Sequence, residues 1–260
     1  MAVILQDDTS ELLNVVGEDG NLFTNDKGAI LTVPRGIAHT YGIRHETTNV
    51  LLVSPRSSTG EIKVYLQKRS HKKRLLPGAW TVSCGGHMGT SIDPVKSAVR
   101  EAEEELGLSL APEQLIPLCD GRIGYANLLK VWRYGSETII QMGSDTSCFG
   151  FARDSVPQKV QDYVEGTGLL DFPAEDAPSG LELEAFNRES CLYYLYLPRL
   201  DEIETTEFKD KEAAGLKEVL LRDLLNSPRS ERTDSSETLI VNCPSLEQII
   251  RGNLPEGGTR

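Results

Sequence analysis

Hydrophobic and polar positions at the start of the chain alternate in short runs that predict β-structure. Residues 12–23 place the turn from Gly17 to Gly20 between two apolar stretches, a pattern typical of a hairpin, and a loop follows through Pro34 and Gly36. The chain is therefore expected to begin with a hairpin extension.

The next apolar runs predict a pair of strands and a short third strand. Residues 48–55 and 61–70 are rich in β-branched and apolar side chains, and a Ser/Thr/Gly turn separates them, so we expect them to pair. A turn, a short strand over residues 80–83 and a glycine loop follow.

Helical spacing begins at Asp93. That residue can cap a helix, Pro94 suits the first helical position, and Gly107 ends the apolar repeat. The repeat consists of Val95, Ala98, Val99, Ala102 and Leu106. The spacing predicts a helix from Pro94 to the residue before Gly107.

The rest of the chain shows both patterns more weakly. Strands are expected near residues 115–118, 137–142 and 190–197, with a short helix over residues 155–166. A closing strand that passes into a helix and a last helix are expected within residues 214–227 and 244–253.

Two segments lack a periodic pattern. Residues 166–186 are rich in Pro, Gly and acidic side chains, so we expect a surface insertion or lid there. Residues 227–237 are polar and are expected to be disordered or loosely held.

The composition is that of a soluble globular protein. The 260 residues, with 39% hydrophobic and 25% charged side chains, can build one core with elaborations. No apolar run approaches the roughly 20 residues of a membrane span. The five cysteines form no CxxC pair, so reduced thiols in the cytoplasm are expected.

The net charge of -12 argues against a nucleic-acid groove, because phosphate backbones are bound by clustered Lys and Arg. The basic segment 67–74 comes nearest to such a cluster. It is either a solvated loop after a strand or a contact for a substrate phosphate through Arg69, Lys72 and Lys73.

The predicted helix concentrates acid in one sector. Glu101, Glu104 and Glu105 repel one another there and oppose the helix dipole. One explanation is a solvated acidic face with Arg100 as partner. The other is a site for a hard divalent ion, Mg²⁺ or Mn²⁺, to which the preceding glycine loop would bring a backbone carbonyl.

The surrounding residues favour the ion site, because the segment resembles the Nudix box, G-x5-E-x7-R-E-U-x-E-E-x-G-U, where U is a bulky apolar residue. The matching positions are Gly86, Arg100, Glu101, Glu104, Glu105, Gly107 and Leu108, with the smaller Ala102 at one U position. Ile92 departs from the box, which has a glutamate there. The acid that braces the arginine is therefore missing or is supplied by Asp93.

The resemblance implies the Nudix fold, an α/β (α+β) fold in which a mixed β-sheet is sandwiched between α-helices. We expect an N-terminal hairpin extension over residues 1–46 and a Nudix domain over residues 47–226. The insertion at about 166–186 interrupts that domain. Residues 227–260 would form a C-terminal tail with a short helix.

The resemblance also implies a reaction, in which water attacks a phosphorus of a metal-bound diphosphate. One box glutamate would act as base. The expected metal ligands are Glu101, Glu104, Glu105, the carbonyl of Gly86 or Gly85, and His87. His87 is otherwise a loop residue packed beneath the helix. Glu212, before the closing strand, would join the catalytic acids or be a solvated loop acid.

Flanking residues resemble another branch of the superfamily, isopentenyl-diphosphate isomerase, which moves a double bond by proton transfer. That branch holds a metal with three histidines, and His39, His45 and His87 stand at about those places. Its catalytic glutamate lies in a late strand, where this chain offers Glu189 as a substrate-binding candidate. Trp80, in the shared Pro-Gly-x-Trp segment, is expected in the core or the wall of the substrate pocket.

Two differences favour hydrolysis. The isomerase has its catalytic cysteine where this chain has Gly85, and Cys84 would point away from the substrate because strand side chains alternate between faces. The isomerase also lacks most of the box glutamates. The sequence therefore predicts a cytoplasmic, Mg²⁺- or Mn²⁺-dependent diphosphohydrolase.

Its partner would be a small-molecule diphosphate: an isoprenoid, a nucleotide sugar, a dinucleotide or thiamine diphosphate. No nucleic-acid or membrane partner is expected, and the protein would act as a monomer or homodimer. The alternatives are an isomerase-like enzyme and a catalytically silent binding module.

Overall fold

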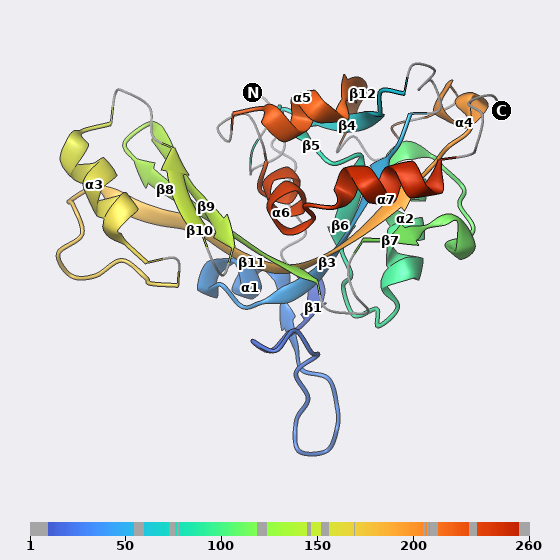
Figure 1. Ribbon diagram of the computed structural model, residues 1–260. Coiled ribbons are helices and arrows are strands. Elements are labelled where there is room, and N and C mark those ends of the chain that lie inside the picture. The colour runs from blue at the N-terminus through green and yellow to red at the C-terminus, as the bar shows by residue number, and fades with distance from the viewer. Residues whose placement is uncertain are drawn as a thin grey trace.

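The structure is a computed structural model that describes residues 10–54, 60–72, 76, 78–118, 124–144, 147–151, 156–168, 170–204, 206, 208, 213–228 and 233–254. Within these residues it contains a seven-stranded sheet, a three-stranded sheet and a two-stranded N-terminal sheet, with helices packed against them (Figure 1). The predicted mixed α/β class is therefore confirmed.

The seven-stranded sheet forms the centre of the molecule. Its strands are β3 (His45–Leu52), β6 (Cys84–His87), β7 (Ile116–Pro117), β8 (Tyr125–Tyr134), β9 (Glu137–Ser144), β10 (Ser147–Phe151) and β11 (Leu181–Tyr196). The order is β10-β9-β8-β11-β3-β6, and β7 pairs with β11. β11 runs parallel to β3 and antiparallel to β8, so the sheet is mixed.

Helices cover both faces of this sheet. Leu192 and Tyr194 of β11 pack in one core cluster with α2 (Pro94–Leu106), while Tyr193 and Leu195 pack in another with α6 (Asp234–Asn242) and α7 (Leu246–Asn253). Consecutive strand residues thus bury opposite faces, as the pleat requires. Figure 1 shows α6 and α7 lying above β11 and β3.

α2 forms as the sequence predicts. The side chain of Asp93 accepts a hydrogen bond from the backbone N–H of Lys96, and Pro94 occupies the first turn. Gly107 ends the helix in the left-handed conformation, φ 69°, where its N–H bonds back to the last turn. The box helix is therefore defined locally at both ends.

The expected pairing of residues 48–55 with residues 61–70 is wrong. The first run belongs to β3, whereas β4 (Lys63–Arg69) lies in a separate sheet of order β12-β4-β5, with β5 at Trp80–Thr81 and β12 at Ala213–Leu220. One bridge between Val53 and Val64 joins the two runs. β4 instead forms its backbone hydrogen bonds with β12 along one edge and with β5 along the other.

The predicted turn from Gly17 to Gly20 is confirmed, because a bridge joins Val16 to Leu22 across it. The strand partner of β1 (Leu12–Asn14) is, however, the later strand β2 (Thr32–Pro34), and a bridge from Thr24 to Ile30 lies between the two. The expected loop through Pro34 and Gly36 is wrong, because Arg35–Tyr41 form helix α1. Pro34 stands before the helix rather than inside it, and Gly42, with φ 61°, ends it.

The segment 166–186 is only partly an insertion. Residues 181–186 begin β11, where they pair with β8, a strand that the sequence pattern did not single out. The predicted helix before this segment is α3 (Gln158–Gly166). The buried ammonium of Lys130 donates hydrogen bonds to the carbonyls of Gly168 and Asp171, at 2.7 and 2.6 Å, and so ties the segment to β8.

The tail is more ordered than expected. Residues 234–237, part of the segment expected to be loosely held, begin α6, and the hydroxyl of Thr233 caps that helix through the N–H of Ser236. The remaining helices are η1 (Pro112–Gln114), α4 (Leu200–Glu204) and α5 (Leu221–Asn226). None of the helices in the described ranges is both long and apolar enough to span a membrane.

Candidate metal and diphosphate site

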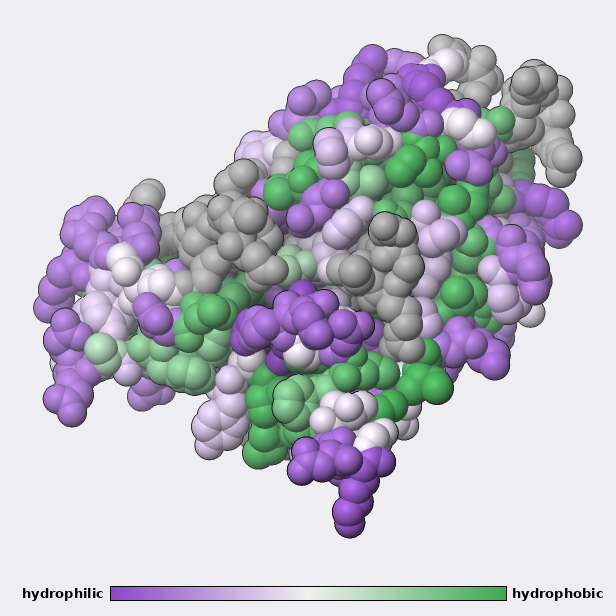
Figure 2. All heavy atoms as spheres, turned by 60° about the horizontal axis from the view of Figure 1, so that its bottom comes forward, coloured by the Kyte–Doolittle hydropathy of each residue, from purple (hydrophilic) through white to green (hydrophobic). Residues whose placement is uncertain are grey.

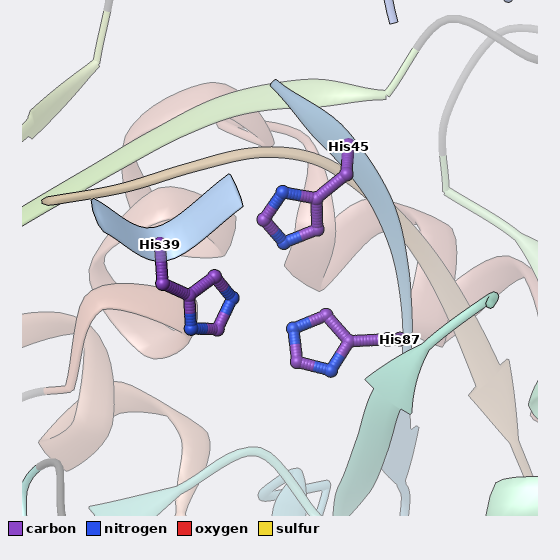
Figure 3. A group of neighbouring side chains, drawn as sticks. All are labelled: His39, His45 and His87. Atoms are coloured by element: carbon purple, nitrogen blue, oxygen red, sulfur yellow. The ribbon is translucent and has the colours of Figure 1, made fainter. Parts of the chain in front are cut away.

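Three histidines from separate elements come together and form what we call the histidine centre. His39 lies on α1, His45 opens β3 and His87 ends β6. Their ring centroids are 5.1 to 5.2 Å apart, and their candidate ligand atoms all lie within 4.8 Å of one another. Figure 3 shows a ring nitrogen of each pointing into the space between the rings.

His45 is held in the form that binds metals. Its Nδ1 lies 2.9 Å from the carbonyl oxygen of Ile43, which can only accept, so Nδ1 carries the hydrogen and Nε2 carries the lone pair. Burial lowers the pKa of His45 to about 4, and the charge of Arg35 adds to this, so the ring is neutral at pH 7. Nε2 is buried and has no hydrogen-bond partner among the described residues.

This arrangement fits a divalent metal ion. Three imidazoles in a tight group suit Zn²⁺ and similar borderline ions, and three protein ligands leave a position open for water or substrate. A buried nitrogen lone pair without a hydrogen bond is costly unless something else occupies it. His87, which the box resemblance placed with the glutamates, is grouped by the structure with His39 and His45.

Glu189 lies next to the histidine centre, on the strand beside it. It is the register partner of His45 in the parallel pair β11 and β3, and neighbouring strands are about 4.8 Å apart. The side-chain N–H groups of Asn187 and Asn127 donate to its two carboxylate oxygens, at 2.6 and 3.0 Å. Thr238 of α6 bonds Asn127 in turn, at 2.9 Å, so Glu189 is rigidly held.

Two of the three box glutamates are buried against β6. The carboxylate of Glu105 accepts hydrogen bonds from the N–H of Gly85 and from Gln67 of β4, both at 3.0 Å. A side chain at Gly86 would lie 2.6 Å from the carboxylate of Glu101, so glycine is needed for this close approach. Within the described residues, however, the ligand atoms of the three box glutamates do not form a close group like that of the histidines.

Glu104 is exposed and pairs with Arg100, whose guanidinium lies 2.7 Å from Glu104 and 2.6 Å from Glu101. Arg100 also donates to the carbonyl of His87, at 3.0 Å. Asp93 does not replace the missing box acid, because its side chain caps α2. Ile92 itself is 58% exposed. Arg100 is thus braced by its own helix and by the end of β6.

Cys84 faces away from the histidine centre, toward α2. Its side chain is fully buried in the core cluster between β3 and α2, and burial, reinforced by the charges of Glu105 and Glu101, raises the pKa of the thiol. A side chain at Gly85 would lie 2.5 Å from the carbonyl oxygen of Thr48 and 2.7 Å from Asn49. The isomerase cysteine therefore has no place at Gly85 without movement of β3.

The other substrate candidates fall near β4. Arg69 ends β4 and shares with Gln67 the face that meets Glu105, since strand residues two apart point the same way. Lys72 is exposed in the following turn. Trp80 is half-buried against the core, and the ammonium groups of Lys68 and Lys217 lie 5.7 and 5.5 Å from the centre of its ring.

Two further candidates, Lys73 and Glu212, lie outside the described residues. Sequence reasoning missed the residues that hold the candidates in place, among them Gln67, Asn127 and Asn187. Each is a polar residue within a strand, and no spacing marks its partner, which lies on another element.

Comparison with known proteins shows which protein family the chain resembles. Residues 44–134 match the family model of the NUDIX domain. An isopentenyl-diphosphate Δ-isomerase of Clavibacter sepedonicus is 32% identical over 95 residues, 36% of this chain and 48% of that protein. An uncharacterized Nudix hydrolase of Streptomyces coelicolor is 32% identical over 108 residues, 42% of this chain and 53% of that protein.

A solved structure from Deinococcus radiodurans aligns with 90% of this chain and 99% of its own, at 17% identity and a TM-score of 0.45. The chain spans about half the length of the two curated relatives just described. The match to the NUDIX domain model over residues 44–134 confirms the resemblance drawn from the box. The chain is thus related both to Nudix hydrolases and to isopentenyl-diphosphate isomerases.

Proposed function

We propose that the protein is a metal-dependent Nudix hydrolase that cleaves a small-molecule diphosphate by attack of water on phosphorus. The P–O–P bond breaks, the water oxygen stays on one phosphate, and the other leaves with the electron pair and takes a proton. The observation that supports this most is the packing of Glu101 and Glu105 against the Gly85–Gly86 backbone, one residue from the histidine centre.

The chain offers two different donor sets. Glu101, Glu104, Glu105 and the carbonyl of Gly86 are oxygen donors of the kind that Mg²⁺ and Mn²⁺ prefer. The histidine centre is a nitrogen set for a more imidazole-preferring ion. Bound ions would neutralise the diphosphate oxygens and help to ionise the attacking water.

The other candidate residues would bind the substrate or hold the glutamates in position. Arg69 and Lys72 would hold the distal phosphate by charge, which a protein of net charge -12 needs near an anionic substrate. Gln67 and the N–H of Gly85 orient Glu105. Glu189, fixed by two amides, would hold a polar group of the substrate or the open position at the histidine centre.

The test is a phosphate-release assay over a panel of diphosphates with Mg²⁺ and Mn²⁺, beginning with isopentenyl diphosphate because of the isomerase relative. Glu105→Gln keeps the shape of the side chain but removes its charge, and we expect at least a hundredfold loss of kcat. Glu103→Gln, on the same helix but outside the proposed donor set, is the matched control.

Equal rates for Glu105→Gln and the unmodified protein, on a substrate that is turned over, would show that the box glutamates do not carry the reaction. No turnover of any diphosphate would favour the silent binding module. Mass analysis after reaction in heavy-oxygen water then locates the phosphorus that is attacked.

An isomerase-like reaction is the second candidate, and the histidine centre beside Glu189 favours it. The burial of Cys84 and the crowding at Gly85 weigh against it, because neither position presents a thiol to the histidine centre. The thiol beside Glu189 is that of Cys191, 3.4 Å from its carboxylate, on β11 rather than on β6. The same incubation with isopentenyl diphosphate separates the two, since isomerisation gives dimethylallyl diphosphate and no free phosphate.

A further inference from the structure

Glu11, in the N-terminal extension, lies beside the histidine centre. Its carboxylate oxygen Oε2 is 3.8 Å from Nδ1 of His87. The His87 side chain is 12% exposed and that of Glu11 31% exposed, so water screens the pair less than on an open surface. Position 11 lies well before residue 44, where the match to the Nudix domain begins.

The N-terminal hairpin holds Glu11 in this place. The backbone N–H of Arg35 donates to the carbonyl of Glu11 at 2.7 Å, and the Arg35 guanidinium lies 3.4 Å from its carboxylate. Asn14, three residues on, bonds the loop after His87 through its backbone to Gly89, at 3.0 Å, and through its side chain to Ser91, at 3.0 Å. The hairpin is therefore docked on the loop between β6 and the box helix.

We propose that Glu11 is a positioning residue that holds His87 in its metal-binding tautomer. A carboxylate next to Nδ1 favours the ring form with the hydrogen on that atom, because the N–H dipole then points at the negative charge. The lone pair is thereby left on Nε2, the nitrogen on the other side of the ring. Histidine ligands in metal sites commonly have such an outer carboxylate.

Glu11 acts on His87 much as the Ile43 carbonyl acts on His45. The N-terminal extension supplies Glu11, which directly precedes β1, and His39 from α1, and Val15 bridges to His45. The extension therefore contributes both a candidate metal ligand and a positioning residue to the histidine centre. This inference rests on the proposed metal centre, and the experiment must separate the two.

The test is an isothermal calorimetric titration of the metal-free full chain with Zn²⁺ and, separately, with Mn²⁺. Glu11→Gln keeps the size of the side chain and removes its charge, and we expect the dissociation constant to rise ten- to a hundredfold. Glu11→Asp keeps the charge and should recover part of the affinity. Glu18→Gln, at an exposed glutamate on the same hairpin that pairs with Arg188, should bind as the unmodified chain does.

A second measurement separates positioning from mere folding. Nitrogen–proton correlation spectra of the metal-free protein should show His87 protonated on Nδ1 in the unmodified chain and a mixture of tautomers in Glu11→Gln, with melting temperatures alike. If Glu11→Gln binds metal as tightly as the unmodified chain, the role of Glu11 is wrong and the centre stands. If the unmodified chain binds no metal, the histidine centre is wrong and this inference falls with it.

Discussion

The neutral state of His45 makes the stability of the metal-free protein depend on pH in a defined window. In the unfolded chain this histidine takes up a proton near its ordinary pKa of 6.5, whereas in the folded protein burial lowers the pKa to about 4. Between these values the unfolded chain binds more protons, so the free energy of unfolding falls as the pH falls. The difference corresponds to roughly 3 kcal/mol, present in full above pH 6.5 and lost at pH 4.

The assay is urea unfolding at several pH values from 7 to 4, with a chelator present, for the unmodified protein and His45→Gln. Other groups titrate in both proteins, so subtraction of the two curves isolates His45. The unmodified protein should lose about 3 kcal/mol more than the variant over this range. His71→Gln, at an exposed histidine, should follow the unmodified curve. Parallel curves for the unmodified protein and His45→Gln would refute a buried, neutral His45.

Two substitutions and one labelling experiment test the packing of individual side chains. Gly42→Ala should lower the free energy of unfolding by about 2 kcal/mol, measured in urea, because φ is 61° there and a Cβ would lie 2.7 Å from the ring of Phe186. Cys84 should resist thiol reagents in the folded protein and react after denaturation, as peptide mass mapping would show. Lys130→Met should cost about 2 kcal/mol, since two backbone carbonyls lose a buried ammonium donor; unchanged stability would contradict that role.

The box helix could be predicted because its signals are local. Asp93, Pro94 and Gly107 define its ends, and one apolar stripe defines its buried face, so the structure adds little to what the sequence states. α1 shows the opposite case. Its seven residues follow a proline and include a glycine, signals that locally favour a loop, and contacts with β11 and the N-terminal hairpin stabilise it instead.

The strands show where long-range pairing overrides composition. Residues 181–186 follow a Pro- and Gly-rich segment and look like part of an insertion, but β8 offers a partner strand and β11 pairs with it across a bulge between Leu183 and Ala185. In the sequence, β3 and β4 look like a hairpin because a short Ser/Thr/Gly segment separates them, yet they belong to different sheets. Sequence pattern identifies strands of this kind better than it identifies their partners.

The candidate site also has residues that the sequence identifies and an arrangement that only the structure gives. The box glutamates and the three histidines could be named from motif and resemblance, but only the structure shows that His39, His45 and His87 meet. Glu11 carries no signal at all, since an acidic residue near a turn is ordinary, and its importance comes from what lies beside it in space.

Arg100 contacts residues of both donor sets. In the Nudix box an acid at the position of Ile92 would brace the arginine. With an exposed isoleucine there, Arg100 instead contacts Glu101 and Glu104 and donates to the carbonyl of His87. One guanidinium therefore contacts the glutamates that would hold one ion and the backbone of a histidine that would hold another.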